Sequence, residues 1–171
     1  MTELHRPTLL DLAHHDRAAF ESGDAALDEW LRRYAGQNRR RDTAATWVIT
    51  DVDHAIVAYA TIAMTAIDRS TAPASVARQA PDPVPALLIG RLAVDQRHSG
   101  LGVGTALVAH VLATAIELNA KAACRAVVVN ALRPAAREWW EHLGFQPFEP
   151  AGEQSLDLYL LTADIQATIV W

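Results

Sequence analysis

The chain is poor in several features that mark particular classes of protein. It contains one cysteine, Cys124, so we expect neither a disulfide framework nor a cysteine-rich metal site. Its first residues lack the apolar stretch of a secretory signal, and no apolar run suffices for the ~30 Å of bilayer hydrocarbon. Repeats and Gly/Ser linkers are also lacking. We therefore expect a cytoplasmic protein without a membrane partner.

What is present is a chain of 171 residues, 51% of them hydrophobic, which suits one domain over residues 1–171. The formal charge of −5 argues against broad attraction to nucleic acid. Positive charge is nevertheless concentrated in a ten-residue stretch without acidic residues that holds Arg32, Arg33, Arg39, Arg40 and Arg41. This stretch is either a solvated helix end or a local site for a polyanion.

Hydrophobic spacing predicts strands alternating with helices, which is an α/β pattern. We expect helices at residues 25–34, 102–119 and 134–142, and a hairpin of strands at 46–50 and 55–63. Further strands are expected at 86–94, 124–129 and 156–161, the last followed by a C-terminal tail. Residues 73–85 contain four prolines and should be irregular surface chain.

Three glycines at alternate positions, Gly100, Gly102 and Gly104, lie between a predicted strand and a predicted helix. Their small size and the free N–H groups of the helix N-terminus predict a site for phosphate oxygens. A dinucleotide fingerprint would require glycine where Thr105 stands, and a P-loop would require Gly-Lys-Ser/Thr, which is missing. The remaining alternative is a glycine-rich turn without a ligand.

Residues 97–102 read Arg-His-Ser-Gly-Leu-Gly, and residues 140–145 read Trp-Glu-His-Leu-Gly-Phe. In this order, with a strand before the first block and a helix after it, the sequence resembles the GNAT superfamily of N-acetyltransferases, whose pyrophosphate motif is Arg/Gln-x-x-Gly-x-Gly/Ala. The resemblance implies the GNAT fold, a central mixed, largely antiparallel twisted sheet flanked by helices. It also implies acetyl-CoA as cosubstrate and no metal.

The resemblance further implies which residues bind acetyl-CoA. The backbone of Leu92, Ala93 and Val94 would lie beside the acetyl and pantetheine groups, and the Val94 N–H would stabilise the oxyanion. Asn130 would lie near the pantetheine arm, unless it is only a turn residue at a strand end. The Arg97 side chain would lie close to the pyrophosphate. The pyrophosphate itself would be held by the backbone N–H groups of the loop, which are those of Arg97, His98, Ser99, Gly100, Leu101, Gly102, Val103, Gly104 and Thr105.

The sequence departs from the family pattern at the group that protonates the departing thiolate. The family places a tyrosine there, whereas this chain has Trp140. An indole N–H donates a hydrogen bond but is not acidic at neutral pH, so a catalytic role for Trp140 is in doubt. Loss of a general acid costs about 10²–10⁴ in rate. Tyr159, His142 and His98 are alternative donors, and Cys124 reads as a packing residue.

A narrower resemblance covers residues 20–31, 46–48 and 83–95, which are similar to the GNAT toxins of type II toxin–antitoxin systems. It implies acetylation of the α-amino group of aminoacyl-tRNA, which inhibits translation. It also implies a homodimer and neutralisation by an antitoxin of the ribbon-helix-helix type. In this context, the five clustered arginines are expected to contact tRNA.

Two other functions fit the sequence. One is a general GNAT enzyme that acetylates a small amine or a protein lysine. The other is a module that binds acetyl-CoA, RNA or an antitoxin with little turnover, which the replacement at Trp140 suggests directly. A general GNAT enzyme would acetylate its substrate without tRNA, whereas a toxin would require tRNA. A binding module would release no coenzyme A, whereas either enzyme would release it.

Overall fold

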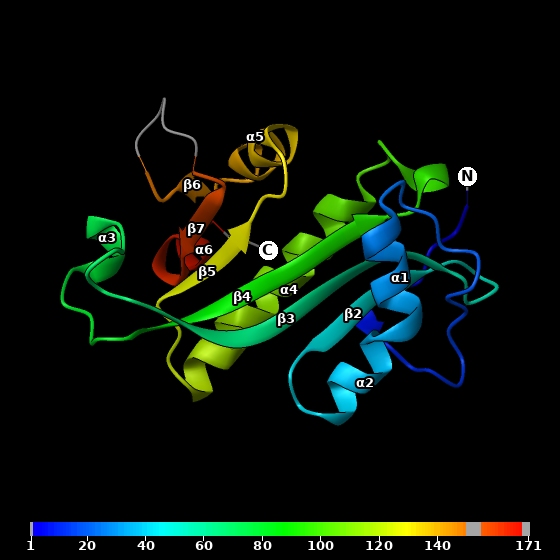
Figure 1. The fold of residues 1–171 in the computed structure, drawn as a ribbon, viewed down its shortest axis with the longest axis horizontal. Coiled ribbons are helices and arrows are strands. Elements are labelled where there is room, and N and C mark those ends of the chain that lie inside the picture. The colour runs from blue at the N-terminus through cyan, green and yellow to red at the C-terminus, as the bar shows by residue number, and fades with distance from the viewer. Residues whose placement is uncertain (1, 150–154, 169–171) are drawn as a thin grey trace. The chain divides into compact units, whose positions relative to one another are not determined.

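The computed structural model describes residues 2–149 and 155–168, which form a mixed α/β fold (Figure 1). The strands are β1 (Thr8–Leu9), β2 (Ala45–Thr50), β3 (Ile56–Ile67), β4 (Val84–Val94), β5 (Ala126–Asn130), β6 (Gln146–Pro147) and β7 (Asp157–Leu161). The helices are α1 (Ala25–Arg33), α2 (Ala35–Arg40), α3 (Ala74–Ala77), the 3-10 turn η1 (Gln96–His98), α4 (Val103–Lys121), α5 (Pro134–His142) and α6 (Thr162–Thr168).

The seven strands have the order β1-β2-β3-β4-β5-β7-β6 in one sheet. The pairs β1–β2, β2–β3, β5–β7 and β6–β7 are antiparallel, whereas β4 and β5 are parallel. The predicted fold class, a mixed and largely antiparallel sheet with flanking helices, is confirmed. The chain divides into two compact units, Met1–Ala63 with Gly90–Val111 and Met64–Ile89 with Leu112–Trp171.

The first unit is built around helix α1 and strands β2 and β3. Asp24 caps α1 by accepting hydrogen bonds from the N–H groups of Ala26 and Leu27, which otherwise lack partners at a helix start. Trp30 and Leu31 turn inward from α1. They pack in a core cluster with Phe20, Ala35, Val48, Ile56, Tyr59 and Ala93. This packing fixes α1 against the end of β4.

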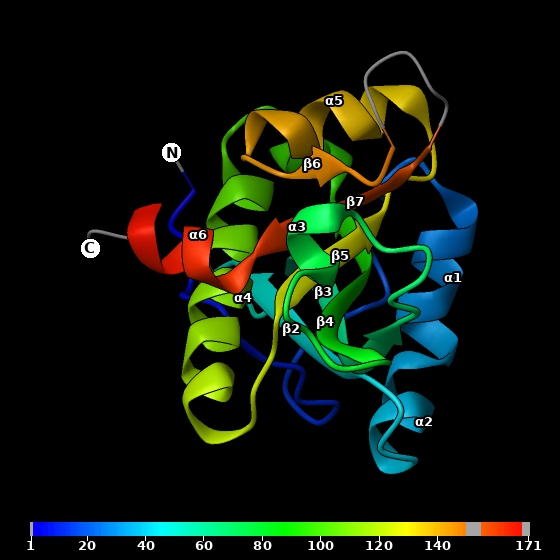
Figure 2. The same cartoon turned by 90° about the vertical axis from the view of Figure 1, so that its left-hand side faces the viewer.

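The second unit contains β5, β7 and β6, together with α3, α5 and α6 (Figure 2). Residues Ala86–Ile89 of β4 pair with Ala126–Val129 of β5, and every residue of β5 pairs antiparallel with β7. The core cluster of this unit includes Ile67, Val76, Ala80, Val84, Ala86, Val128 and Tyr159. Gly144 has a φ of +98° after α5, which is the left-handed helix end that its position predicts.

Helix α4 has 19 residues and a mean hydropathy of 1.4, which are the length and composition of a membrane-spanning helix. Core helices meet the same criteria. One third of the apolar window is buried within the protein, including Leu107, Val111 and Ala115, which are fully buried.

Several short elements differ from the sequence predictions. Helix α2 continues after α1, and β1 and β6 have only two residues each. The proline-rich stretch contains α3, whose first turn follows Pro73, a residue that suits a helix start. The expected C-terminal tail is wrong for residues 162–168, which form α6, while residues 169–171 lie outside the described part of the chain.

Candidate functional site

The glycine loop connects β4 to α4 in the first unit. Gly100 and Gly102 have φ angles of +75° and +78°, a region that residues with a side chain rarely adopt. A Cβ atom at either glycine would meet no other atom within 4 Å, so conformation and not crowding requires glycine there. The first N–H groups of α4 have no carbonyl of an earlier helical turn to bind. This geometry suits a phosphate group.

The end of β4 leads into this loop. Pairing of β4 with β5 covers Ala86–Ile89, so the backbone of Leu92, Ala93 and Val94 lies beyond that ladder. On its other side, the chain remains tied to β3, where the Asp95 N–H donates to the Val57 carbonyl over 2.8 Å. The strand end is therefore fixed from one side, which leaves backbone groups available for a ligand on the other.

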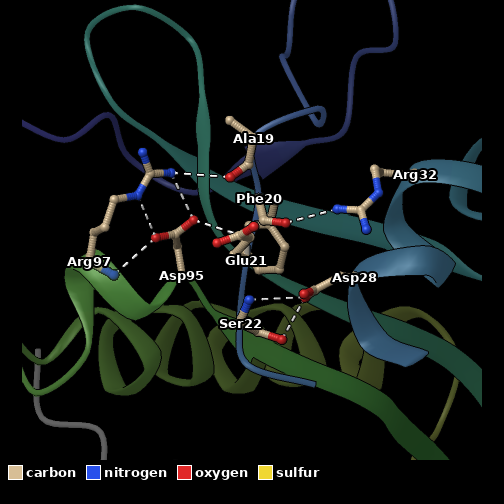
Figure 3. Close-up of polar contacts among 8 residues, drawn as sticks. All are labelled: Ala19, Phe20, Glu21, Ser22, Asp28, Arg32, Asp95 and Arg97. Carbon is tan, nitrogen blue, oxygen red and sulfur yellow. Dashed lines mark hydrogen bonds and ion pairs between the residues drawn. The ribbon is translucent and has the colours of Figure 1, made fainter. Parts of the chain in front are cut away.

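Asp95 holds the start of the loop in place, a structural role that the sequence interpretation missed. Its carboxylate is buried and accepts from Arg97 Nε and Nη2, both over 2.9 Å, and from the Arg97 N–H over 3.0 Å (Figure 3). The Arg97 side chain lowers the pKa of Asp95 to about 2, although burial opposes this shift. The signal was an aspartate directly before a short helical turn, which is a common capping position.

Arg97 also donates to the Ala19 carbonyl over 3.3 Å, which begins a series of contacts to residues 19–22 (Figure 3). The Glu21 N–H donates to Asp95, and the Gln96 N–H donates to the Glu21 carbonyl. Ser22 donates to the buried carboxylate of Asp28 through its hydroxyl and its N–H. The guanidinium expected beside the pyrophosphate thus connects the loop to the segment before α1.

The five clustered arginines do not form a uniform surface. Arg32 donates to the Phe20 carbonyl over 2.9 Å, so it is partly a structural residue (Figure 3). Arg33 pairs with Glu29 over 3.1 Å, and Arg39 lies 3.7 Å from Asp42. These ion pairs are exposed and contribute little stability. Arg39, Arg40 and Arg41 are all exposed around the C-terminal end of α2, and among the described residues no acidic side chain pairs with Arg40 or Arg41.

In the second unit, Trp140 is a buried residue of α5 with 6% exposure. Its ring packs edge-on against Phe145, with centroids 5.0 Å apart, and against Trp139, with centroids 4.9 Å apart. These contacts account for an indole at this position by packing. Asn130, the last residue of β5, is exposed and donates to the Asp157 carboxylate over 2.6 Å.

The alternative proton donors have partners of their own. The Tyr159 hydroxyl donates to Gln146 Oε1 over 3.1 Å and lies 2.9 Å from Ser75 Oγ. His142 Nδ1 lies 2.8 Å from the Glu138 carbonyl. His98 keeps a buried Nδ1 without a hydrogen-bond partner among the described residues. Burial raises the pKa of the Cys124 thiol, which fits packing and not nucleophilic chemistry.

Residues 9–145 match the Acetyltransferase (GNAT) family. The chain is 33% identical, over 156 residues and 90% of each chain, to the tRNA-acetylating toxin of Mycobacterium tuberculosis. Among solved structures, AtaT complexed with acetyl-methionyl-tRNAfMet aligns with a TM-score of 0.87 at 24% identity, covering 96% of this chain and 98% of AtaT. A Tyr-to-Phe variant of AtaT, bound to acetyl-CoA and the C-terminus of the antitoxin AtaR, aligns with a TM-score of 0.83 at 23% identity. This alignment covers 98% of the present chain and 99% of the AtaT variant.

The two solved structures share the fold, and the family match extends across both the glycine loop and α5. The described residues contain no group of three or more His, Cys, Asp and Glu side chains that could hold a metal ion. The bacterial relative adds similarity along nearly the whole length. The chain therefore belongs to the GNAT family of acetyltransferases and, within it, to the subgroup of GNAT toxins.

Proposed function

We propose that this protein transfers the acetyl group of acetyl-CoA to the α-amino group of aminoacyl-tRNA and thereby inhibits translation. The observation that carries the proposal is the 33% identity to a tRNA-acetylating toxin over 90% of both chains. The glycine loop before α4 supports it, because its conformation suits the pyrophosphate of acetyl-CoA. The protein would act in the cytoplasm as a single domain.

Backbone groups at the end of β4 carry the first step of the reaction. The uncharged amine attacks the thioester carbonyl, and the Val94 N–H stabilises the negative oxygen that forms. Leu92 and Ala93 flank the acetyl and pantetheine groups, and residues 97–105 hold the pyrophosphate. Asn130 contacts the pantetheine arm. Collapse of the intermediate then breaks the carbon–sulfur bond, the new amide nitrogen loses its extra proton to solvent, and the departing coenzyme A thiolate takes up a proton.

The present chain lacks the tyrosine that supplies this proton in the family. Trp140 occupies the family position for the donor, but its N–H is not acidic and its ring is packed among aromatic side chains. Thiolate is a tolerable leaving group, so we expect slow turnover. The same observation favours a second candidate function, a module that binds acetyl-CoA or an antitoxin without substantial turnover.

Partners follow from the solved relatives. AtaT has been determined with a tRNA and with the C-terminus of the antitoxin AtaR. We infer that this chain has a small antitoxin of the ribbon-helix-helix type and forms a homodimer. The tRNA contacts would centre on Arg39, Arg40 and Arg41, which lie together and exposed at the end of α2, whereas Arg32 donates to the Phe20 carbonyl.

The deciding experiment measures transfer of labelled acetyl groups from acetyl-CoA to a pool of charged tRNAs. Labelled aminoacyl-tRNA supports the toxin function, whereas label only on free amines or proteins contradicts it. Replacing Arg39, Arg40 and Arg41 together by alanine should weaken tRNA binding. The slope of log K against log salt concentration should become shallower by up to about 0.7–0.9 for each phosphate contact that is lost. The KM for acetyl-CoA should stay unchanged in that variant.

A further inference from the structure

Arg91 is the one charged residue in the otherwise apolar strand β4. It directly precedes Leu92, where the backbone is proposed to flank the acetyl group. Gly90 before it is exposed although β4 is an interior strand of the sheet, and Arg91 itself is half-buried. A Cβ atom at Gly90 would come within 3.1 Å of Thr61 Oγ1 on β3. Glycine therefore avoids a close contact between β4 and β3 directly before Arg91.

The Arg91 guanidinium is held on an aromatic ring. Its central carbon lies 4.4 Å from the ring centroid of Trp30, which is itself only 7% exposed. Trp30 stacks on Tyr59, with centroids 5.9 Å apart and planes 9° from parallel. The Tyr59 hydroxyl donates to the Leu27 carbonyl over 2.7 Å, which fixes the pair against α1. The ring contact thus orients the guanidinium plane without using its N–H donors.

Other arginines with little freedom use those donors within the protein. Each donates to a carbonyl or carboxylate oxygen, as seen for Arg17, Arg32, Arg69, Arg97, Arg125 and Arg137. Within the described ranges 2–149 and 155–168, the Arg91 guanidinium has the Trp30 ring and no such oxygen. The donors of this half-buried guanidinium are left to solvent, so an anion from outside can take the place of the water.

We propose that Arg91, supported by Trp30, binds a phosphodiester group near the 3′ end of the acceptor RNA. A phosphate fits because the planar guanidinium fork donates two parallel hydrogen bonds to its oxygens. The location fits because an acceptor amine must approach the thioester beside Leu92 and Val94, so the RNA end that carries the amine must pass this part of β4. The inference rests on the proposed function, since a small amine offers no phosphate there.

The test compares Arg91→Gln, Arg91→Lys and the wild type in two assays. The first is steady-state acetylation, with KM determined separately for charged tRNA and for acetyl-CoA. The second is binding of uncharged tRNA, measured by fluorescence anisotropy over a series of salt concentrations. Arg6→Gln is the matched control, because Arg6 is an exposed arginine of the same unit outside the proposed contacts. Thermal unfolding monitors the fold of every variant.

We expect Arg91→Gln to weaken tRNA binding and raise the KM for charged tRNA about 10- to 100-fold, as for a lost charged hydrogen bond. The slope of log K against log salt concentration should become shallower by about 0.7, the value for one phosphate of a single strand. Arg91→Lys should recover part of the affinity because it keeps the charge but not the fork. The KM for acetyl-CoA and all properties of Arg6→Gln should stay within about twofold of the wild type.

Two results would overturn the inference. One is unchanged tRNA affinity and salt dependence in a folded Arg91→Gln protein. The other is an equal rise of the KM for acetyl-CoA, which would assign Arg91 to the cosubstrate. The anisotropy assay keeps these outcomes separate from the proposed function: a wild type that binds tRNA through Arg91 but acetylates none contradicts only the enzymatic proposal.

Discussion

The two compact units differ in how closely they keep the pattern of the family. The first retains the glycine loop, which is braced by the ion pair between buried Asp95 and the exposed Arg97 side chain. The second holds tryptophan in α5 at the family's tyrosine position, among aromatic neighbours. The loop predicted to hold the pyrophosphate and the family position of the proton donor therefore lie in different units. Substitutions in the glycine loop and at Trp140 should therefore alter the affinity for acetyl-CoA and the turnover rate separately.

The strongest test of the first unit is Gly102→Val. A β-branched residue is strained at a φ of +78°, so the loop should lose the conformation that holds the pyrophosphate. At about 100 Kd, acetyl-CoA should stabilise the wild type by ~2.7 kcal/mol, which raises Tm by several degrees. Gly102→Val should lose this shift in differential scanning fluorimetry.

Gly144→Val is the matched control for backbone strain. Its φ is +98°, and, as at Gly102, a Cβ atom would meet nothing within 4 Å. We expect Gly144→Val to lower the Tm without ligand about as much as Gly102→Val does. The rise in Tm that acetyl-CoA causes should be preserved in Gly144→Val. A full shift in Gly102→Val would contradict the assignment of the loop.

In the second unit, Trp140→Tyr tests whether a proton donor limits turnover. A phenol at this position should raise kcat, up to about 10²-fold, and leave the KM for acetyl-CoA nearly unchanged. Pre-steady-state release of coenzyme A measures the change directly. Trp140→Phe removes the indole without adding an acid and should give no increase. Equal rates for both variants would mean that another group supplies the proton.

Acid should destabilise the first unit through Asp95. Its folded pKa of about 2 lies below the ordinary value of 3.8, so the carboxylate contributes stability above pH 4 that is lost as pH falls toward 2. The contribution is about 2 kcal/mol in the free energy of unfolding. Urea unfolding at several pH values should show Asp95→Asn less stable than the wild type at pH 7. A constant difference between the two proteins down to pH 2 would contradict this linkage.

The smallest effect is expected for Tyr159→Phe in the second unit. Loss of the hydroxyl contacts to Ser75 and Gln146 should lower the free energy of unfolding by about 0.5–1.5 kcal/mol. Ser75→Ala is the control, because it removes one of these contacts and keeps the phenol. If Tyr159→Phe instead abolishes acetylation while Ser75→Ala does not, Tyr159 is the proton donor that Trp140 cannot be.

The fold was largely predictable because its main elements have clear local signals. The spacing of Leu27, Trp30 and Leu31 predicts α1, and the β-branched runs predict β2 and β5. Strands as short as Thr8–Leu9 and Gln146–Pro147 carry no periodicity, since pairing with a longer strand defines them. Helix α6 was missed because its seven residues contain one buried apolar side chain, Ile165, within the part described.

The site was predictable only where residues adjacent in sequence act together. The positive φ angles of Gly100 and Gly102 agree with the motif, because a loop conformation is encoded locally. Contacts between distant residues could not be read from the chain. The bond from Arg97 to Ala19 spans 78 positions, and the stacking of Arg91 on Trp30 spans 61. Arg91 reads as an ordinary charge, and Arg97 as part of the loop motif alone, until the fold provides these partners.

The contacts around residues 19–22 have a consequence for divergence among related sequences. Arg97 and Asp95 bind the main chain of Ala19 and Glu21 (Figure 3), as the Gln96 N–H does at Glu21, and none of these contacts requires a particular side chain at positions 19 and 21. Positions 19 and 21 are thus free to drift. Positions 95 and 97 are not, because each must match the other. A protein can keep this architecture while the side chains at positions 19 and 21 change.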